Sequence, residues 1–178
     1  LAAAAKPALL NGDRRDLRDI NLITIDGSDA RDFDDAVWAE KDQAKNNEDG
    51  WRIIVAIADV AHYVKPNDAL DIDARKRGNS VYFPDRVIPM LPEALSNGMC
   101  SLRPNEDRAC LAVQIIIDSK GKKLSHKFFR GLMRSKARVT YEDIQSIFES
   151  TDNVRESGNF IGRLAVNLYG AFNVLHSG

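Results

Sequence analysis

Residues 20–39 read INLITIDGSDARDFDDAVWA, and they predict two strands joined by an acidic loop. The first segment, residues 20–25, is short and rich in β-branched side chains, which is typical of a buried strand. Residues 36–39 are again apolar and predict a second strand. Asp26 therefore follows a core strand directly, and the aspartates after it lie on a loop anchored by the sheet.

Outward from this loop, the sequence predicts further strands and then helices. Two strands are predicted from apolar runs at residues 51–59 and 109–118, and a third at residues 123–137 as the return strand after a hairpin-type turn at residues 119–122. The helices are predicted from helical periodicity at residues 68–77, 140–149 and 159–175, with Gly78 ending the first and a capping box at Thr140 opening the second. Residues 84–104 carry four prolines and predict a long irregular segment. Because most strands come first along the chain and the longer helices come last, the sequence predicts the α+β class.

The composition is that of an ordinary soluble domain. The chain has 178 residues, of which 44% are hydrophobic and 29% charged, with a net charge of −1. The longest apolar run, residues 53–58, is far shorter than the roughly 20 residues that a membrane span needs. Cys100 and Cys110 are too few for a disulfide framework, and we expect two reduced thiols in a cytoplasmic protein.

The acidic loop carries the densest chemical signal. Five aspartates fall within residues 26–35. Like charges held together at a strand end repel one another unless cations neutralise them. Carboxylate oxygens suit hard ions, and Mg²⁺ takes a few carboxylates together with waters and phosphates, so the loop predicts a Mg²⁺ site that Mn²⁺ can also fill. The alternative is a solvated acidic surface loop.

A calcium-binding EF-hand is excluded by spacing. Counted from Asp32, such a loop needs Gly at position 37 and Glu at position 43, where Val37 and Gln43 stand.

Charge is segregated along the chain. Nine acidic residues and three basic ones lie between residues 26 and 49, whereas residues 120–138 contain eight Lys or Arg and no acid. This basic hairpin has two interpretations, a path for a phosphate backbone or a solvated strand face.

Residues 24–36, TIDGSDARDFDDA, resemble the active-site signature of the ribonuclease II and ribonuclease R exoribonucleases, the RNB family, and most of all that of its bacterial ribonuclease R branch. Four further blocks resemble the family in the same order: VAIADV at 55–60, RGNSVYFP at 77–84, IPMLP at 88–92 and LSNGMCSL at 95–102. The resemblance implies the fold of the N-terminal half of an RNB catalytic domain over residues 16–178, with a mixed, mainly antiparallel sheet and flanking helices. Residues 1–15 are then a lead-in segment.

The same resemblance implies metal-dependent 3′→5′ hydrolysis of single-stranded RNA to nucleoside 5′-monophosphates. The residues that match the family's four metal-centre aspartates are Asp26, Asp32, Asp34 and Asp35, here called the four aspartates. Asp34 matches the one most directly tied to catalysis. Tyr82 matches an aromatic that stacks on the RNA, although the pattern alone would make it a core aromatic.

We expect the chain to be a catalytic-domain fragment of a monomeric protein that binds single-stranded RNA and no membrane, with no protein partner deducible. The alternative from another class is a non-catalytic module that binds RNA or a partner. A third interpretation, a metal-dependent phosphatase of small esters, stays open on the residues alone.

Overall fold

The computed structural model describes residues 2, 5–149 and 160–177. The strands of its large sheet are β1 (Arg15–Asp16), β2 (Ile23–Asp26), β3 (Asp35–Lys41), β4 (Trp51–Ala58), β7 (Asp107–Ile117), β8 (Lys123–Arg134) and β9 (Ala137–Thr140). A separate hairpin consists of β5 (Val81–Tyr82) and β6 (Val87–Ile88). The helices are α1 (Val60–Tyr63), α2 (Ala69–Arg77), the π-helical turn η2 (Ala94–Met99), α3 (Tyr141–Glu149) and α5 (Phe160–Ser177).

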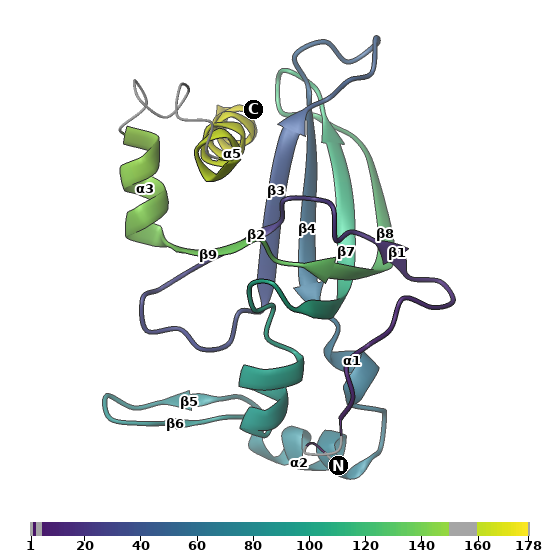
Figure 1. The fold of residues 1–178 in the computed structure, drawn as a ribbon, viewed down its shortest axis with the longest axis vertical. Helices are drawn as coiled ribbons and strands as arrows, with labels where there is room; N and C mark the ends of the chain where they lie inside the picture. The colour runs from purple at the N-terminus through teal and green to yellow at the C-terminus, as the bar shows by residue number, and fades with distance from the viewer. Residues whose placement is uncertain (1, 3–4, 150–159, 178) are drawn as a thin grey trace.

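The large sheet has the strand order β1-β8-β7-β4-β3-β2-β9 (Figure 1). β1 pairs with β8 and β2 pairs with β9 in parallel, and the other neighbours are antiparallel. The predicted α+β class with a mixed, mainly antiparallel sheet is confirmed.

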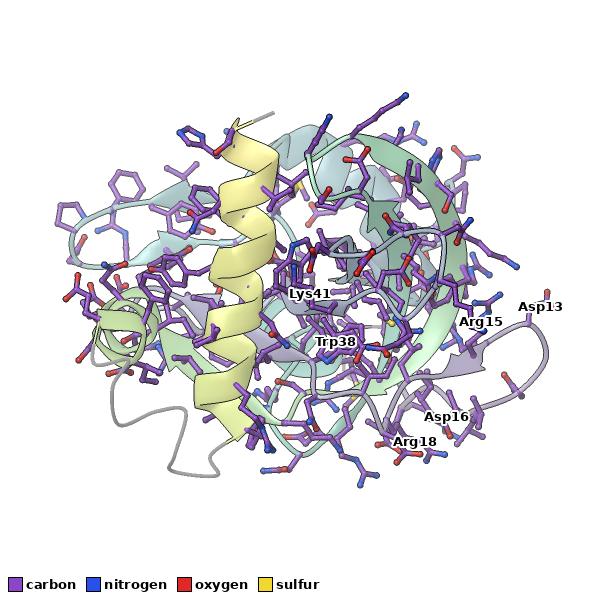
Figure 2. All side chains as sticks on the ribbon, turned by 90° about the horizontal axis from the view of Figure 1, so that it is seen from above. Asp13, Arg15, Asp16, Arg18, Trp38 and Lys41 are labelled. Carbon is purple, nitrogen blue, oxygen red and sulfur yellow. The ribbon has the colours of Figure 1, made fainter. Side chains whose placement is uncertain are left out.

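The two faces of the sheet are packed differently. α3 and α5 cover one face around β2, β3 and β9, where Ile23, Val139 and Leu164 form a buried cluster. Figure 2 shows α5 lying across the sheet near Trp38 and Lys41. On the other face, Ala36 opposes Ala56 in register, and Ala56 opposes Ala112. These small side chains allow the long loops at the lower end of the sheet to pack closely.

The prediction of a single return strand at residues 123–137 is wrong, because the chain leaves β8 after Arg134. Ser135 is buried, and its carbonyl oxygen accepts a hydrogen bond from the backbone N–H of Asn105. The backbone N–H of Lys136 donates to the carbonyl oxygen of Leu22. The chain thereby crosses the end of the sheet and continues as β9 along β2, which brings Arg138 to the acidic loop.

The helix signals are confirmed where the structure describes them. Thr140 Oγ1 accepts from the N–H of Asp143, 3.1 Å away, and the N–H of Thr140 donates to Asp143 Oδ2, so the capping box forms. Asp68 caps α2, and Gly78 ends it with φ of 80°. Residue 159 of the third predicted helix lies outside the described residues. No helix in the described part of the chain has the length and hydropathy of a membrane span.

Candidate functional site

The four aspartates gather at one end of the sheet. Asp26 is the last residue of β2 and Asp35 is the first of β3. Because β2 and β3 are antiparallel neighbours with Ile23 opposite Val37, both residues lie at the same end. Asp32 and Asp34 lie on the connecting loop, so the fold brings the four predicted residues together. We call residues 26–35 the acidic loop.

The middle of the acidic loop is anchored by Phe33. Its side chain is only 8% exposed and packs into the main core. The backbone N–H of Phe33 donates to Ser101 Oγ at 3.0 Å, and the Phe33 carbonyl oxygen accepts from the N–H of Leu102 at 2.8 Å. The segment that follows η2 therefore holds the loop by one side-chain and one main-chain hydrogen bond.

Three neighbouring hydrogen bonds complete this anchor. Ser101 Oγ also donates to the carbonyl oxygen of Arg31, and Ser101 itself is fixed because its carbonyl oxygen accepts from Arg108 Nε at 2.9 Å. The carbonyl oxygen of Asp34 accepts from the N–H of Ala58, at the end of β4, at 2.8 Å. Sequence reasoning did not identify Ser101 as part of the site, although it stands in the family-like block at residues 95–102.

The first half of the acidic loop is held by Arg138 of β9. One terminal nitrogen of its guanidinium donates to the carbonyl oxygens of Gly27 and Ser28, each at 2.8 Å. The guanidinium carbon lies 5.3 Å from the centre of the Phe33 ring. The sequence indicated Arg138 only as the end of the basic hairpin.

The carboxylates act on one another electrostatically. Desolvation raises the pKa of Asp34, although the residue is exposed overall, and Asp32, Asp35 and Asp26 raise it further in that order. Desolvation likewise raises the pKa of Asp26, with Asp35 as the next cause. The charge cluster expected from the sequence is therefore present in three dimensions.

Asp26 also has an unused hydrogen-bond acceptor. Its Oδ2 atom is buried and forms no hydrogen bond of normal geometry among the described residues, although the nearby Thr24 hydroxyl lowers the pKa of the carboxyl group. A buried carboxylate oxygen without a partner is costly, and a cation is the natural way to satisfy it. The donor set of this cluster therefore fits a hard divalent ion.

The carboxylates do not converge on a single point. Within residues 2, 5–149 and 160–177, no three His, Cys, Asp or Glu side chains stand close enough together to hold a metal ion. Mg²⁺ in proteins commonly takes one or two carboxylates and completes its shell with waters and phosphates. The observed spacing suits that kind of site better than an all-protein cage.

Tyr82 lies on the β5–β6 hairpin, away from the acidic loop in sequence. It is 67% exposed, so the interpretation as a core aromatic is wrong for the described fold. In Figure 1 this hairpin and the acidic loop project toward the same side of the molecule. The aromatic is free to stack on a ligand.

The basic side chains of the hairpin differ in their contacts. Arg134 pairs with Asp107 at 2.7 Å, and Arg138 binds the acidic loop. Lys120, Lys122 and Lys127 are exposed. The lysines toward the turn are thus accessible, as both a solvated strand face and a path for a phosphate backbone require, whereas Arg134 and Arg138 at the other end make structural contacts.

Comparison with known proteins identifies the family. Residues 14–176 match the RNB domain. The chain is 49% identical over 162 residues to ribonuclease R of Escherichia coli, which covers 91% of this chain and 19% of that protein. It is 52% identical over 149 residues to ribonuclease R of Acidithiobacillus ferrooxidans, covering 84% of this chain and 33% of that one.

Solved structures with a similar fold include members of the same family. Mycoplasma genitalium RNase R in complex with double-stranded RNA superposes with a TM-score of 0.77 at 32% identity, covering 91% of this chain and 27% of that one. Yeast Ssd1, described as a pseudonuclease, shares the fold alone, with a TM-score of 0.68 at 18% identity, covering 84% of this chain and 18% of that one. The chain spans about a fifth of the E. coli relative's length. With the RNB match covering nearly all of its residues, this chain belongs to the RNB domain family and is similar to ribonuclease R.

Proposed function

We propose that this chain supplies the acidic loop of a metal-dependent 3′→5′ exoribonuclease, which hydrolyses single-stranded RNA to nucleoside 5′-monophosphates. The observation that carries the proposal is the cluster of four carboxylates that act on one another, in which Asp26 has a buried oxygen without a hydrogen bond of normal geometry. Similarity to ribonuclease R supports the RNA substrate.

The four aspartates would hold Mg²⁺, or Mn²⁺ in its place. A divalent ion there supplies Lewis-acid stabilisation of phosphate charge and lowers the pKa of an attacking water. Asp26 and Asp35 offer carboxylates from fixed strand ends. The backbone of Asp34 is held by the hydrogen bond that its carbonyl oxygen accepts from Ala58, and its carboxylate would serve as a ligand of the ion and as an acceptor for the attacking water.

RNA binding is proposed to use Tyr82. Stacking of a base on an exposed aromatic contributes about 1–3 kcal/mol without sequence preference, which suits a processive enzyme. Two Mycoplasma genitalium RNase R structures contain RNA, one double-stranded and one a ribose-methylated single strand. The two buried, unpaired cysteines support a reducing compartment, and we propose the cytoplasm.

The test places the chain in a complete protein, by exchanging it for the matching segment of E. coli ribonuclease R. With Mg²⁺ and 5′-labelled poly(A), we expect a ladder of shortened products. Asp34→Asn should abolish the ladder and keep RNA binding, and Asp29→Asn, in the same loop, should leave it intact. Unchanged hydrolysis with Asp34→Asn would contradict the assignment.

The alternative is a non-catalytic RNA-binding module. The fold does not decide against it, since a protein described as a pseudonuclease shares this fold. It predicts RNA binding without hydrolysis in the exchanged protein. A phosphatase of small esters predicts instead hydrolysis of p-nitrophenyl phosphate and indifference to RNA length.

A further inference from the structure

Arg138 approaches the acidic loop from a strand that is distant in sequence. β9 runs parallel to β2, with Arg138 opposite Thr24 and Thr140 opposite Asp26. Residues paired in this way, and residues two apart on one strand, project to the same face of a sheet. The side chains of Thr24, Asp26 and Arg138 therefore share one face.

The guanidinium of Arg138 reaches the turn that follows Asp26. Its terminal nitrogen binds the carbonyl oxygens of Gly27 and Ser28, the two residues directly after Asp26. Its planar group also lies over the Phe33 ring. Arg138 thus contacts both the start and the middle of the acidic loop, where a Lys side chain would offer neither a planar surface nor a fixed fork of donors.

Three buried polar atoms on this face form no hydrogen bond of normal geometry among the described residues: Thr24 Oγ1, Asp26 Oδ2 and Arg138 Nε. The Thr24 hydroxyl is nevertheless near enough to the Asp26 carboxylate to lower its pKa. Unpartnered buried polar atoms are rare in native folds, and their concentration beside a functional loop requires an explanation.

We propose that Arg138 is a positioning residue, which fixes the turn after Asp26 and thereby orients the Asp26 carboxylate relative to the other three aspartates. It does not touch the substrate and acts through the acidic loop. The consequence of this role for catalysis rests on the proposed function. The effect of Arg138 on the acidic loop does not depend on metal binding.

The experiment compares the 178-residue chain with three variants. Arg138→Met removes the positive charge and the hydrogen-bond donors of the side chain, whereas Arg138→Lys keeps the charge. Arg134→Met is the matched control, because it removes the ion pair with Asp107 and no contact to the acidic loop. Amide hydrogen exchange without metal is measured by mass spectrometry for peptides covering the acidic loop and the β7–β8 pair. Mn²⁺ affinity is measured by titration.

In Arg138→Met, exchange in the acidic loop should rise by about tenfold, because two hydrogen bonds that fix the loop are lost, while β7–β8 stays unchanged. The Mn²⁺ concentration at half-saturation should rise by about 10- to 100-fold, as for other residues that orient metal ligands. Arg138→Lys should show a smaller rise in both. Arg134→Met should alter neither quantity.

The outcomes separate the two proposals. If the unsubstituted chain binds no Mn²⁺, the proposed metal site fails for this chain, while the exchange comparison still tests Arg138. Unchanged exchange in the acidic loop of Arg138→Met overturns the positioning role, as does a rise spread equally over the whole sheet. If Arg138→Met does not fold, the test rests on Arg138→Lys, which should show a moderate rise in loop exchange and in the Mn²⁺ concentration at half-saturation. If both quantities in Arg138→Lys equal those of the unsubstituted chain, the positioning role is overturned.

Discussion

The hydroxyl oxygen of Ser101 lies 3.0 Å from the backbone nitrogen of Phe33, a residue 68 positions earlier in the chain, and fixes the middle of the acidic loop. Ser101→Ala removes this acceptor and leaves the buried N–H of Phe33 unpaired. Since an unsatisfied buried donor costs about 1–3 kcal/mol, the free energy of unfolding should fall by that amount. Urea denaturation measures it, and Ser125→Ala, on the exposed part of β8, is the control. An unchanged midpoint for Ser101→Ala would show that water replaces the hydroxyl.

Asp26→Asn should have opposite effects without and with metal. In EDTA, removal of a desolvated charge beside Asp35 relieves repulsion and should raise the unfolding free energy by up to about 1 kcal/mol. With saturating Mg²⁺, the unsubstituted chain should gain about 2.7 kcal/mol at one hundred times the dissociation constant, and the variant should gain little. Thermal melts in both buffers measure this.

Asp29→Asn is the control for this comparison, because Asp29 is exposed on the same loop. It should follow the unsubstituted chain in both buffers. A loss of stability in EDTA for Asp26→Asn would mean that the Asp26 charge is already well compensated, by Arg138 for example.

The sequence predicted those parts of the site that depend on neighbouring residues. The β2–β3 hairpin follows from local apolar runs, and it alone brings Asp26 and Asp35 together. The capping box at Thr140 is equally local, and it formed as predicted.

The contacts of Ser101 and Arg138 were not predictable in this way. Arg138 reaches Gly27 across 111 positions, through a parallel pairing that no local pattern encodes. Residues 123–137 were predicted as one return strand, because the break at Ser135 depends on hydrogen bonds to distant main chain and not on a Gly or Pro. Long-range pairing therefore determined how the acidic loop is held, whereas local sequence determined which residues it carries.

The ion pair of Arg14 with Asp59 is buried, with side-chain exposures of 6% and 5%, and the two atoms are 2.6 Å apart. Arg14→Met leaves the Asp59 carboxylate buried, with Arg130 at 3.9 Å as a weaker partner. Breaking a buried pair from one side costs about 3–5 kcal/mol, so a large loss of stability is expected in urea denaturation.

The double variant Arg14→Met with Asp59→Leu tests the cause of that loss. Since it removes both charges, it should recover a large part of the stability lost by Arg14→Met alone. Additive losses in the double-mutant cycle would show that the two side chains stabilise the fold by packing and not by their charges.

The edge of the sheet at β1 should make stability depend on acid pH. Arg18 donates to Asp16 and to Asp107, and Figure 2 shows Asp16 and Arg18 on the side of the molecule away from α5. The Arg18 guanidinium lowers the pKa of Asp16 from 3.8 to about 2, and Arg134 followed by Arg18 lowers the pKa of Asp107. Because these folded-state pKa values lie below the unfolded ones, the stabilisation is present above pH 3.8 and is lost as the pH falls toward about 2.

Unfolding free energies of the unsubstituted chain and of Arg18→Met should therefore differ at pH 5 and converge near pH 2, with the other carboxylates cancelling in the difference. A gap between the two chains that stays constant from pH 5 to pH 2 would assign the effect of Arg18 to its packing.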